Sequence, residues 1–145
     1  FAMISKIGKN FQRGDVVLDP FLGTGTTMQA AILCGRNSIG YDIDPAFEEM
    51  TREGIKSLKV DNCNMAIKQR FDDHKAFIAD RENAGKEVKH FNMTLNVPVM
   101  TGQEEKIALH YLKQIDCPNE GEIKVEYIEG SDFTSLPHTS SDTLF

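Results

Sequence analysis

One segment near the start of the chain places the tightest limit on the fold. An apolar run at residues 16–18 leads into a glycine-rich stretch at residues 19–27, and a helical pattern follows at residues 28–33. This order predicts a strand, a tight turn and a helix. Such a turn directs backbone N–H groups and the positive end of a helix toward a ligand above the strand. Its glycines, Gly23 and Gly25, let a ligand approach the main chain closely.

The residues that flank these glycines exclude two common nucleotide sites. A Walker-type phosphate loop requires Lys and then Ser or Thr after its last glycine, but Gly25 is followed by Thr26 and Thr27. The dinucleotide fingerprint requires a third glycine at the position that Met28 occupies. The turn therefore suits a ligand with a nucleoside and a small carboxylate end.

A second acidic residue is placed to bind a ribose. Residues 36–45 read as a second strand that ends in acid, and Asp42 lies 23 positions after Asp19. An acid about 20 positions beyond the glycine turn binds the ribose hydroxyls in such βαβ units. A carboxylate accepts hydrogen bonds from both hydroxyls of a diol. The first 45 residues therefore predict a cradle for an amino-acid end and a clamp for a ribose.

Together these residues resemble the S-adenosylmethionine site of the DNA methyltransferases that modify adenine N6 or cytosine N4. The matching stretches are residues 14–27, 30–31, 35–37 and 39–42. The resemblance implies that S-adenosylmethionine is the cofactor, and that Asp42 binds its ribose. It also implies a role in DNA methylation, as in restriction–modification. The cofactor-binding residues that it implies are Asp19, Pro20, Phe21, Gly23, Thr24, Gly25, Thr26, Thr27 and Asp42.

The catalytic motif of that family does not occur in this sequence. The motif is Asp, Asn or Ser, then Pro-Pro, then an aromatic residue, whereas all five prolines here are isolated. In a permuted (beta-type) subgroup the catalytic half precedes the cofactor half. The resemblance therefore implies the C-terminal part of such an enzyme, inactive alone and with no catalytic residue of its own. It implies that DNA is bound through the other half and that the target base is flipped out.

Composition fits one soluble domain with a core, since the chain has 145 residues and 40% are hydrophobic. No apolar run of about 18 residues and no signal pattern occur, so we expect no membrane partner. Three cysteines, with no metal-like spacing, predict free thiols, a cytoplasmic location and no metal. Residues 93–145 hold nine acidic and three basic residues, which accounts for the net charge of −6. That third of the chain should repel DNA.

Periodicity predicts the remaining elements. Helices are predicted at residues 2–11, 26–33, 64–82 and 103–114, strands at 16–19, 38–42, 94–99 and 123–128, and a further helix after Asp44-Pro45. An apolar stripe on that further helix is formed by Phe47, Met50, Gly54 and Leu58. Gly35 is placed to end the helix at 26–33.

These elements predict an α/β chain: a partial Rossmann-like methyltransferase fold, with parallel strands and flanking helices, plus a C-terminal α+β extension. The S-adenosylmethionine-binding βαβ region spans residues 1–60, the helical and α+β extension spans 61–130, and a flexible tail spans 131–145. The sequence leaves a homodimer open.

Four further residues have alternative interpretations. Asp44 reads as a helix N-cap rather than a ligand. Phe21 either packs over the cofactor or enters the core. Tyr41 has a core or adenine-edge role, and His74, on an apolar helical face, is interpreted as a packed histidine.

Two other functions stay open at this point. The chain could be a non-catalytic module that binds S-adenosylmethionine or dimerises. It could also be part of a methyltransferase that acts on RNA or on a small molecule.

Overall fold

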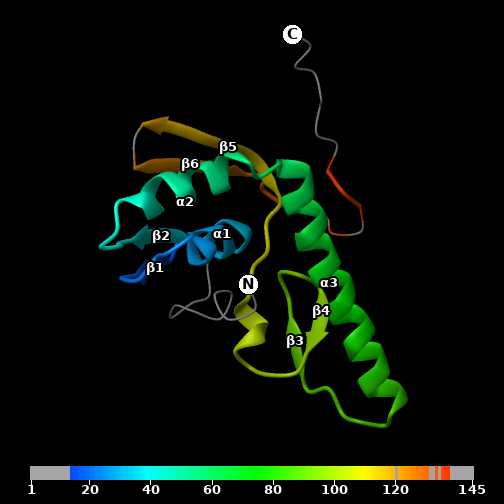
Figure 1. Ribbon diagram of the computed structural model, residues 1–145. Helices are drawn as coiled ribbons and strands as arrows, with labels where there is room; N and C mark the ends of the chain where they lie inside the picture. Colours follow the sequence, from blue (N-terminus) through cyan, green and yellow to red (C-terminus); the bar gives the residue numbers. More distant parts are fainter. Residues whose placement is uncertain (1–13, 120, 131–132, 134, 138–145) are drawn as a thin grey trace.

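The computed structural model describes residues 14–119, 121–130, 133 and 135–137, so the predicted helix at 2–11 lies outside the described residues. The elements are β1 (Val16–Asp19), α1 (Thr26–Leu33), β2 (Asn37–Gly40), α2 (Ala46–Lys56), α3 (Val60–Asn83), β3 (His90–Asn92), β4 (Val97–Val99), the 3-10 helix η2 (Glu104–Lys106), β5 (Leu112–Asn119) and β6 (Glu122–Tyr127). Figure 1 shows their arrangement.

The first three elements form the predicted βαβ unit. β1 and β2 pair in parallel, with Asp19 opposite Gly40. β1 and α1 have the predicted bounds, and β2 ends two residues earlier than predicted. Val17 is buried against Ala31 and Cys34, so α1 covers one face of the pair. The small parallel sheet with flanking helices agrees with a methyltransferase-like α/β fold.

The other face of this sheet is exposed. Val16 is 56% exposed, Leu18 61% and Ile39 48%. The sequence predicted a strand that is apolar on both faces, and parallel strands are normally covered on both. Among the residues that the structure describes, only one face of the pair is buried, which leaves an apolar surface of three side chains.

α2 begins at Ala46, two residues after the predicted N-cap acid Asp44. The Asp44 carboxylate accepts a hydrogen bond from the Ala46 N–H at 2.9 Å, which confirms the N-cap interpretation. The predicted apolar stripe is partly confirmed, because Phe47, Gly54 and Leu58 are half-buried and Leu58 packs against the core. Met50 is wrong: it is 52% exposed, and Thr51 and Ile55 are the buried residues. The reason is that the helix presents Thr51 to the glycine turn, where the Thr51 hydroxyl donates to the Gly23 carbonyl at 3.1 Å.

α3 carries the core of the rest of the chain. Ile67, Phe71 and Ile78 are buried, as their helical spacing predicted, although the helix begins four residues earlier than expected. His74 Nε2 lies 2.8 Å from the Pro98 carbonyl oxygen, so this histidine is packed, as interpreted. The strand predicted at 94–99 is shorter, because its first half forms the turn between β3 and β4.

The helix predicted at residues 103–114 is wrong. Only the three residues of η2 are helical, and an extended segment follows. Ile107, Leu109 and Tyr111 are buried at every second position, which is the period of a strand. Apolar residues at these positions are compatible with the period of a helix or with that of a strand. In the structure the segment is extended.

A buried side chain fixes the start of β5. Asn64 on α3 donates to the Leu112 carbonyl at 2.9 Å and accepts from the Leu112 N–H at 2.7 Å. Both residues are almost fully buried. The contact joins positions 48 residues apart, so local periodicity could not predict it.

Replacing Asn64 with Ala should destabilise the chain strongly. It leaves the buried N–H and C=O of Leu112 without this partner, at a cost of about 1–3 kcal/mol each. Chemical denaturation should report a loss of roughly 2–4 kcal/mol in the free energy of unfolding. Asn83→Ala, an exposed change at the end of α3, is the control and should cost less than about 0.5 kcal/mol. Equal losses for the two variants would contradict the assigned role.

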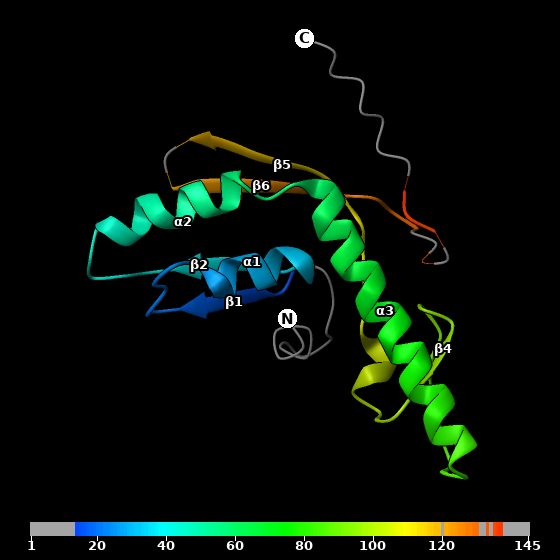
Figure 2. The same ribbon diagram turned by 45° about the vertical axis from the view of Figure 1, so that its right-hand side comes forward.

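β5 and β6 form an antiparallel hairpin, with Leu112 opposite Tyr127. β6 starts and ends one residue before the predicted strand. The Tyr127 hydroxyl donates to the Ile32 carbonyl at 2.8 Å, which fastens the base of the hairpin to the end of α1. In Figures 1 and 2 the hairpin runs alongside α2, on the side away from β1.

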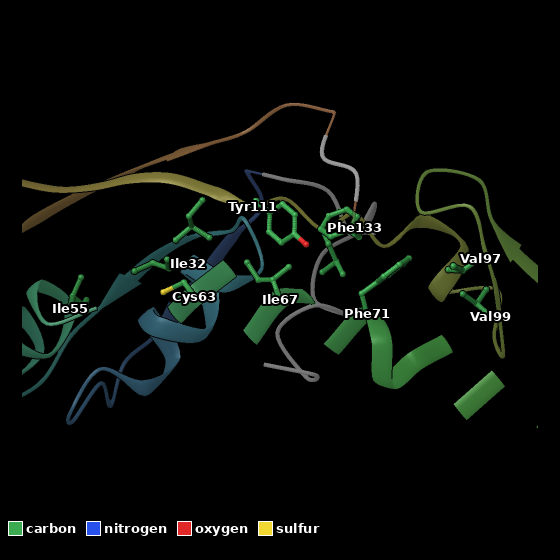
Figure 3. Close-up of a cluster of buried hydrophobic side chains, with 11 residues drawn as sticks. Ile32, Ile55, Cys63, Ile67, Phe71, Val97, Val99, Tyr111 and Phe133 are labelled. Carbon is green, nitrogen blue, oxygen red and sulfur yellow. The ribbon is translucent and has the colours of Figure 1, made fainter. Parts of the chain in front are cut away.

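One hydrophobic core joins these elements (Figure 3). Phe133 is buried in it, and its ring centroid lies 4.8 Å from that of Tyr111 and 5.3 Å from that of Phe71. The other members are Ile32, Ile55, Cys63, Ile67, Val97, Val99, Leu109 and Leu112. The division at residues 60 and 130 stays a prediction, and much of the predicted tail lies outside the described residues.

The described residues contain no helix that is both long and apolar enough to cross a membrane. Within the same residues, no cluster of His, Cys, Asp and Glu side chains could hold a metal ion. Cys34 and Cys63 are buried thiols, and Cys117 is half-buried.

Candidate functional site

The glycine turn begins at an ordered carboxylate. Asp19, the last residue of β1, accepts a hydrogen bond from the Phe21 N–H at 3.0 Å. A hydrogen bond from the Thr27 side chain and the bond from Phe21 lower the pKa of Asp19 below its usual value. The strand end therefore presents a fixed negative charge beside the first turn of α1.

Gly25 is the tightest point of the turn. Its φ is +80°, and a β-carbon there would lie 2.5 Å from Thr51 Cγ2. Both the backbone conformation and the close approach of α2 require glycine. The positive φ therefore belongs to the turn itself.

Asp42 ties the second strand to the turn. Its carboxylate accepts hydrogen bonds from the Gly23 N–H at 2.8 Å and from the Asp44 N–H at 3.0 Å. The bonds from Asp44 and Gly23 lower the pKa of Asp42, so the group stays charged. A carboxylate offers about four lone-pair sites, and the Ile43 N–H takes a further one, so the exposed carboxylate keeps room to accept from a ligand hydroxyl.

The structure brings most of the predicted site residues together. Backbone bonds from Leu22 N–H to the Tyr41 carbonyl and from Tyr41 N–H to the Asp19 carbonyl, both 2.9 Å, hold the two strand ends side by side. Asp19, Gly23, Gly25, Thr27 and Asp42 thus belong to one connected group.

Four predicted residues lie on the outer surface of the turn. Pro20, Thr24 and Thr26 are exposed, and Phe21 is 85% exposed. The alternative that placed Phe21 in the core is therefore wrong. Packing over a ligand remains its open interpretation.

A cleft of about 380 Å³ opens beside Asp42. Its apolar walls are formed by residues that follow β2 and by residues of α2. Of the residues that follow β2, Ile43 is fully exposed and Tyr41 is 64% exposed. The exposure of Tyr41 excludes the core alternative. The residues that line the cleft are Leu22, Met28, Gly40, Tyr41, Asp42, Ile43, Asp44, Pro45, Phe47, Glu48, Thr51, Arg52, Gly121, Glu122 and Ile123.

Two parts of this site were not predicted from the sequence. Thr51 reads as an ordinary polar helical position, and nothing local indicates that it meets Gly25. The tip of the β5–β6 hairpin lies more than 75 residues beyond Asp42 in the sequence, and it reaches the cleft because the hairpin packs on α1 and α3. Both contacts depend on how distant elements dock.

The part of the chain that contains this turn matches a family of known proteins. The family described as DNA methylase matches residues 3–53, which include β1, α1, β2 and most of α2. The type II methyltransferase M.MthZI of Methanothermobacter thermautotrophicus is 46% identical over 99 residues, which are 68% of this chain and 26% of that protein.

Two further relatives carry similar names. The type II methyltransferase M.MjaI of Methanocaldococcus jannaschii is 57% identical over 49 residues, or 32% of this chain and 16% of that protein. The type II methyltransferase M.BglI of Bacillus subtilis is 33% identical over 63 residues, or 43% of this chain and 18% of that protein.

The chain spans about a quarter or less of the length of these relatives. No solved structure matches it. From the family match and the relatives together, the chain contains a DNA N6/N4 methyltransferase-like region.

Proposed function

We propose that this chain is the cofactor-binding portion of a DNA methyltransferase and that it holds S-adenosylmethionine beside Asp42. The observation that carries the proposal is the position of the Asp42 carboxylate. It is charged and exposed, it is 2.8 Å from the Gly23 N–H, and it opens onto the cleft. One ligand can therefore reach both the glycine turn and the acid.

The two ends of the site suit different parts of the cofactor. The exposed carboxylate of Asp42 accepts from the ribose hydroxyls. The turn leads into α1, whose first N–H groups and positive dipole end favour the carboxylate of the methionine moiety. Asp19 supplies the matching negative charge for its ammonium group.

The chemistry that follows is a direct transfer. When bound, S-adenosylmethionine supplies a sulfonium-activated methyl group for the exocyclic amine of adenine (N6) or cytosine (N4). The residues of this chain hold and orient that donor. The sequence contains no Pro-Pro-aromatic motif for the amine, so we assign amine binding to a separate part of the enzyme.

The exposed face of the β1–β2 sheet supports the assignment of amine binding to a separate part of the enzyme. Val16, Leu18 and Ile39 form an apolar surface on a parallel pair that is normally covered on both faces. The remainder of the enzyme, which the curated relatives contain, would cover it. DNA would be bound by that remainder, because residues 93–145 carry nine acids and three bases.

Replacing Asp42 with Ala tests the ribose assignment. We expect the affinity for S-adenosylhomocysteine, the demethylated product, to fall at least tenfold. Each hydrogen bond to a charged group contributes roughly 1.5–3 kcal/mol, and two are lost. Isothermal titration calorimetry of wild type and variant measures the change.

A second ligand separates the ribose contact from damage to the turn. The 2′-deoxy analogue of S-adenosylhomocysteine should bind the wild type more weakly than the parent compound, and Asp42→Ala should remove that difference. Asp44→Ala is the matched control, since Asp44 caps α2 and should leave the preference for the 2′-hydroxyl intact. A preference that survives in Asp42→Ala would remove Asp42 from the ribose site.

A further inference from the structure

We infer that Ile123 on β6 contacts the purine base of the bound cofactor, so that the β5–β6 hairpin completes the nucleoside site. This inference rests on the proposed function. It concerns a part of the chain that lies beyond residues 3–53, the region that matches the DNA methylase family. Nothing in that match assigns a role to the hairpin.

The fold carries the tip of the hairpin to the cleft. Its base is fixed at α1 by the bond from the Tyr127 hydroxyl to the Ile32 carbonyl, and at α3 by the pair between Asn64 and Leu112. From there the hairpin runs alongside α2 (Figures 1 and 2). Gly121, Glu122 and Ile123 then line the same cleft as Asp42.

The alternation of β6 selects Ile123. Ile123, Val125 and Tyr127 are half-buried and pack against the core, whereas the side chains of Lys124 and Glu126 are 65% and 58% exposed. Of the three inward residues, only Ile123 lines the cleft beside Asp42. It is therefore an apolar side chain held in place by the sheet and directed at the ligand space.

The walls of the cleft suit a flat apolar group. Tyr41, Ile43 and Phe47 line it from the end of β2 and the start of α2, and Ile123 lines it from the hairpin. A ribose held at Asp42 has the amino-acid end on the side of the glycine turn, so its base extends into this cleft. The volume of about 380 Å³ lies in the range of pockets that enclose small ligands.

The experiment compares two ligands that differ only in the base. S-adenosylhomocysteine carries adenine, and S-ribosylhomocysteine lacks it. We expect Ile123→Ser to weaken binding of S-adenosylhomocysteine by about tenfold or more, the effect of removing apolar contact in a pocket. Binding of S-ribosylhomocysteine should change less than about twofold, because that ligand never reaches Ile123.

Lys124→Ser is the matched control, because it places the same residue one position further along β6 on the exposed face. It should leave both affinities at the wild-type value. Ile123→Val keeps the apolar contact and most of the packing, so it should keep most of the affinity for S-adenosylhomocysteine. Thermal unfolding of each variant shows whether the hairpin still folds.

The outcomes separate the two proposals. A wild-type chain that binds neither ligand overturns the proposed function. A wild type that binds both ligands equally, or an Ile123→Ser variant that loses both equally, overturns the base site and leaves the proposed function standing. If Ile123→Ser fails to fold, two other results test the base site. The wild type must prefer the ligand with adenine, and Ile123→Val must keep most of the affinity for that ligand; failure of either overturns the base site.

Discussion

Gly25→Val should abolish binding of S-adenosylhomocysteine while leaving most of the helix content intact. The φ of +80° is a conformation that a β-branched residue strongly disfavours. The new side chain would also begin 2.5 Å from Thr51 Cγ2. Backbone strain costs roughly 1–3 kcal/mol and overpacking a similar amount, so the turn should leave its present conformation. Calorimetry for binding and far-UV circular dichroism for helix content measure the two effects.

Gly85→Val separates strain from contact. Gly85 has a φ of +71°, but a β-carbon added there would meet nothing within 4 Å, and the residue follows α3, away from the site. The Gly85→Val variant should bind S-adenosylhomocysteine with the wild-type affinity. A smaller change offers a rescue: Gly25→Ala should weaken binding, and Thr51→Ser should restore part of it by removing Cγ2 while keeping the hydroxyl that donates to Gly23. Normal binding by Gly25→Val would show that the turn does not hold the ligand as described.

The second large effect is on catalysis. We expect the 145-residue chain alone to transfer no methyl group to DNA and to bind DNA weakly. The sequence contains no Pro-Pro-aromatic motif, and residues 93–145 carry nine acidic and three basic residues. In our proposal, the remainder of the enzyme packs on the exposed surface that Val16, Leu18 and Ile39 form on β1 and β2.

Transfer of labelled methyl groups to mixed-sequence duplex DNA tests this expectation. The chain is assayed alone and together with a separate polypeptide that contains a Pro-Pro-aromatic motif. Activity should appear only when a Pro-Pro-aromatic motif is supplied. Robust transfer by the chain alone would place a catalytic group among its own residues.

Local sequence patterns predicted the part of the fold that positions the site. The glycine turn, α1 and the capped start of α2 are set by neighbouring residues, such as Asp44 and its bond to the Ala46 N–H. The separation of Asp19 and Asp42 along the sequence is also set locally, because one short βαβ unit lies between them. These features need no knowledge of distant contacts, so the sequence was sufficient.

The larger errors involve distant contacts. Residues 107–112 were predicted as helix, but the bonds between Asn64 and Leu112 and the burial of Tyr111 favour an extended chain. Thr51 and Ile123 reach the site only because α2 and the hairpin dock on it. Packing of this kind overrides local preference, and periodicity does not record it.

The most direct test of the central claim is a titration of the ¹⁵N-labelled chain with S-adenosylhomocysteine, followed by amide chemical shifts. If the cofactor lies between the glycine turn and Asp42, the amides of Gly23, Gly25 and Asp44 should shift most. The amides of Gly85 and Gly130, away from the cleft, should stay in place. Shifts spread evenly over the chain, or none at saturating ligand, would contradict the claim that this turn and this acid form the cofactor site.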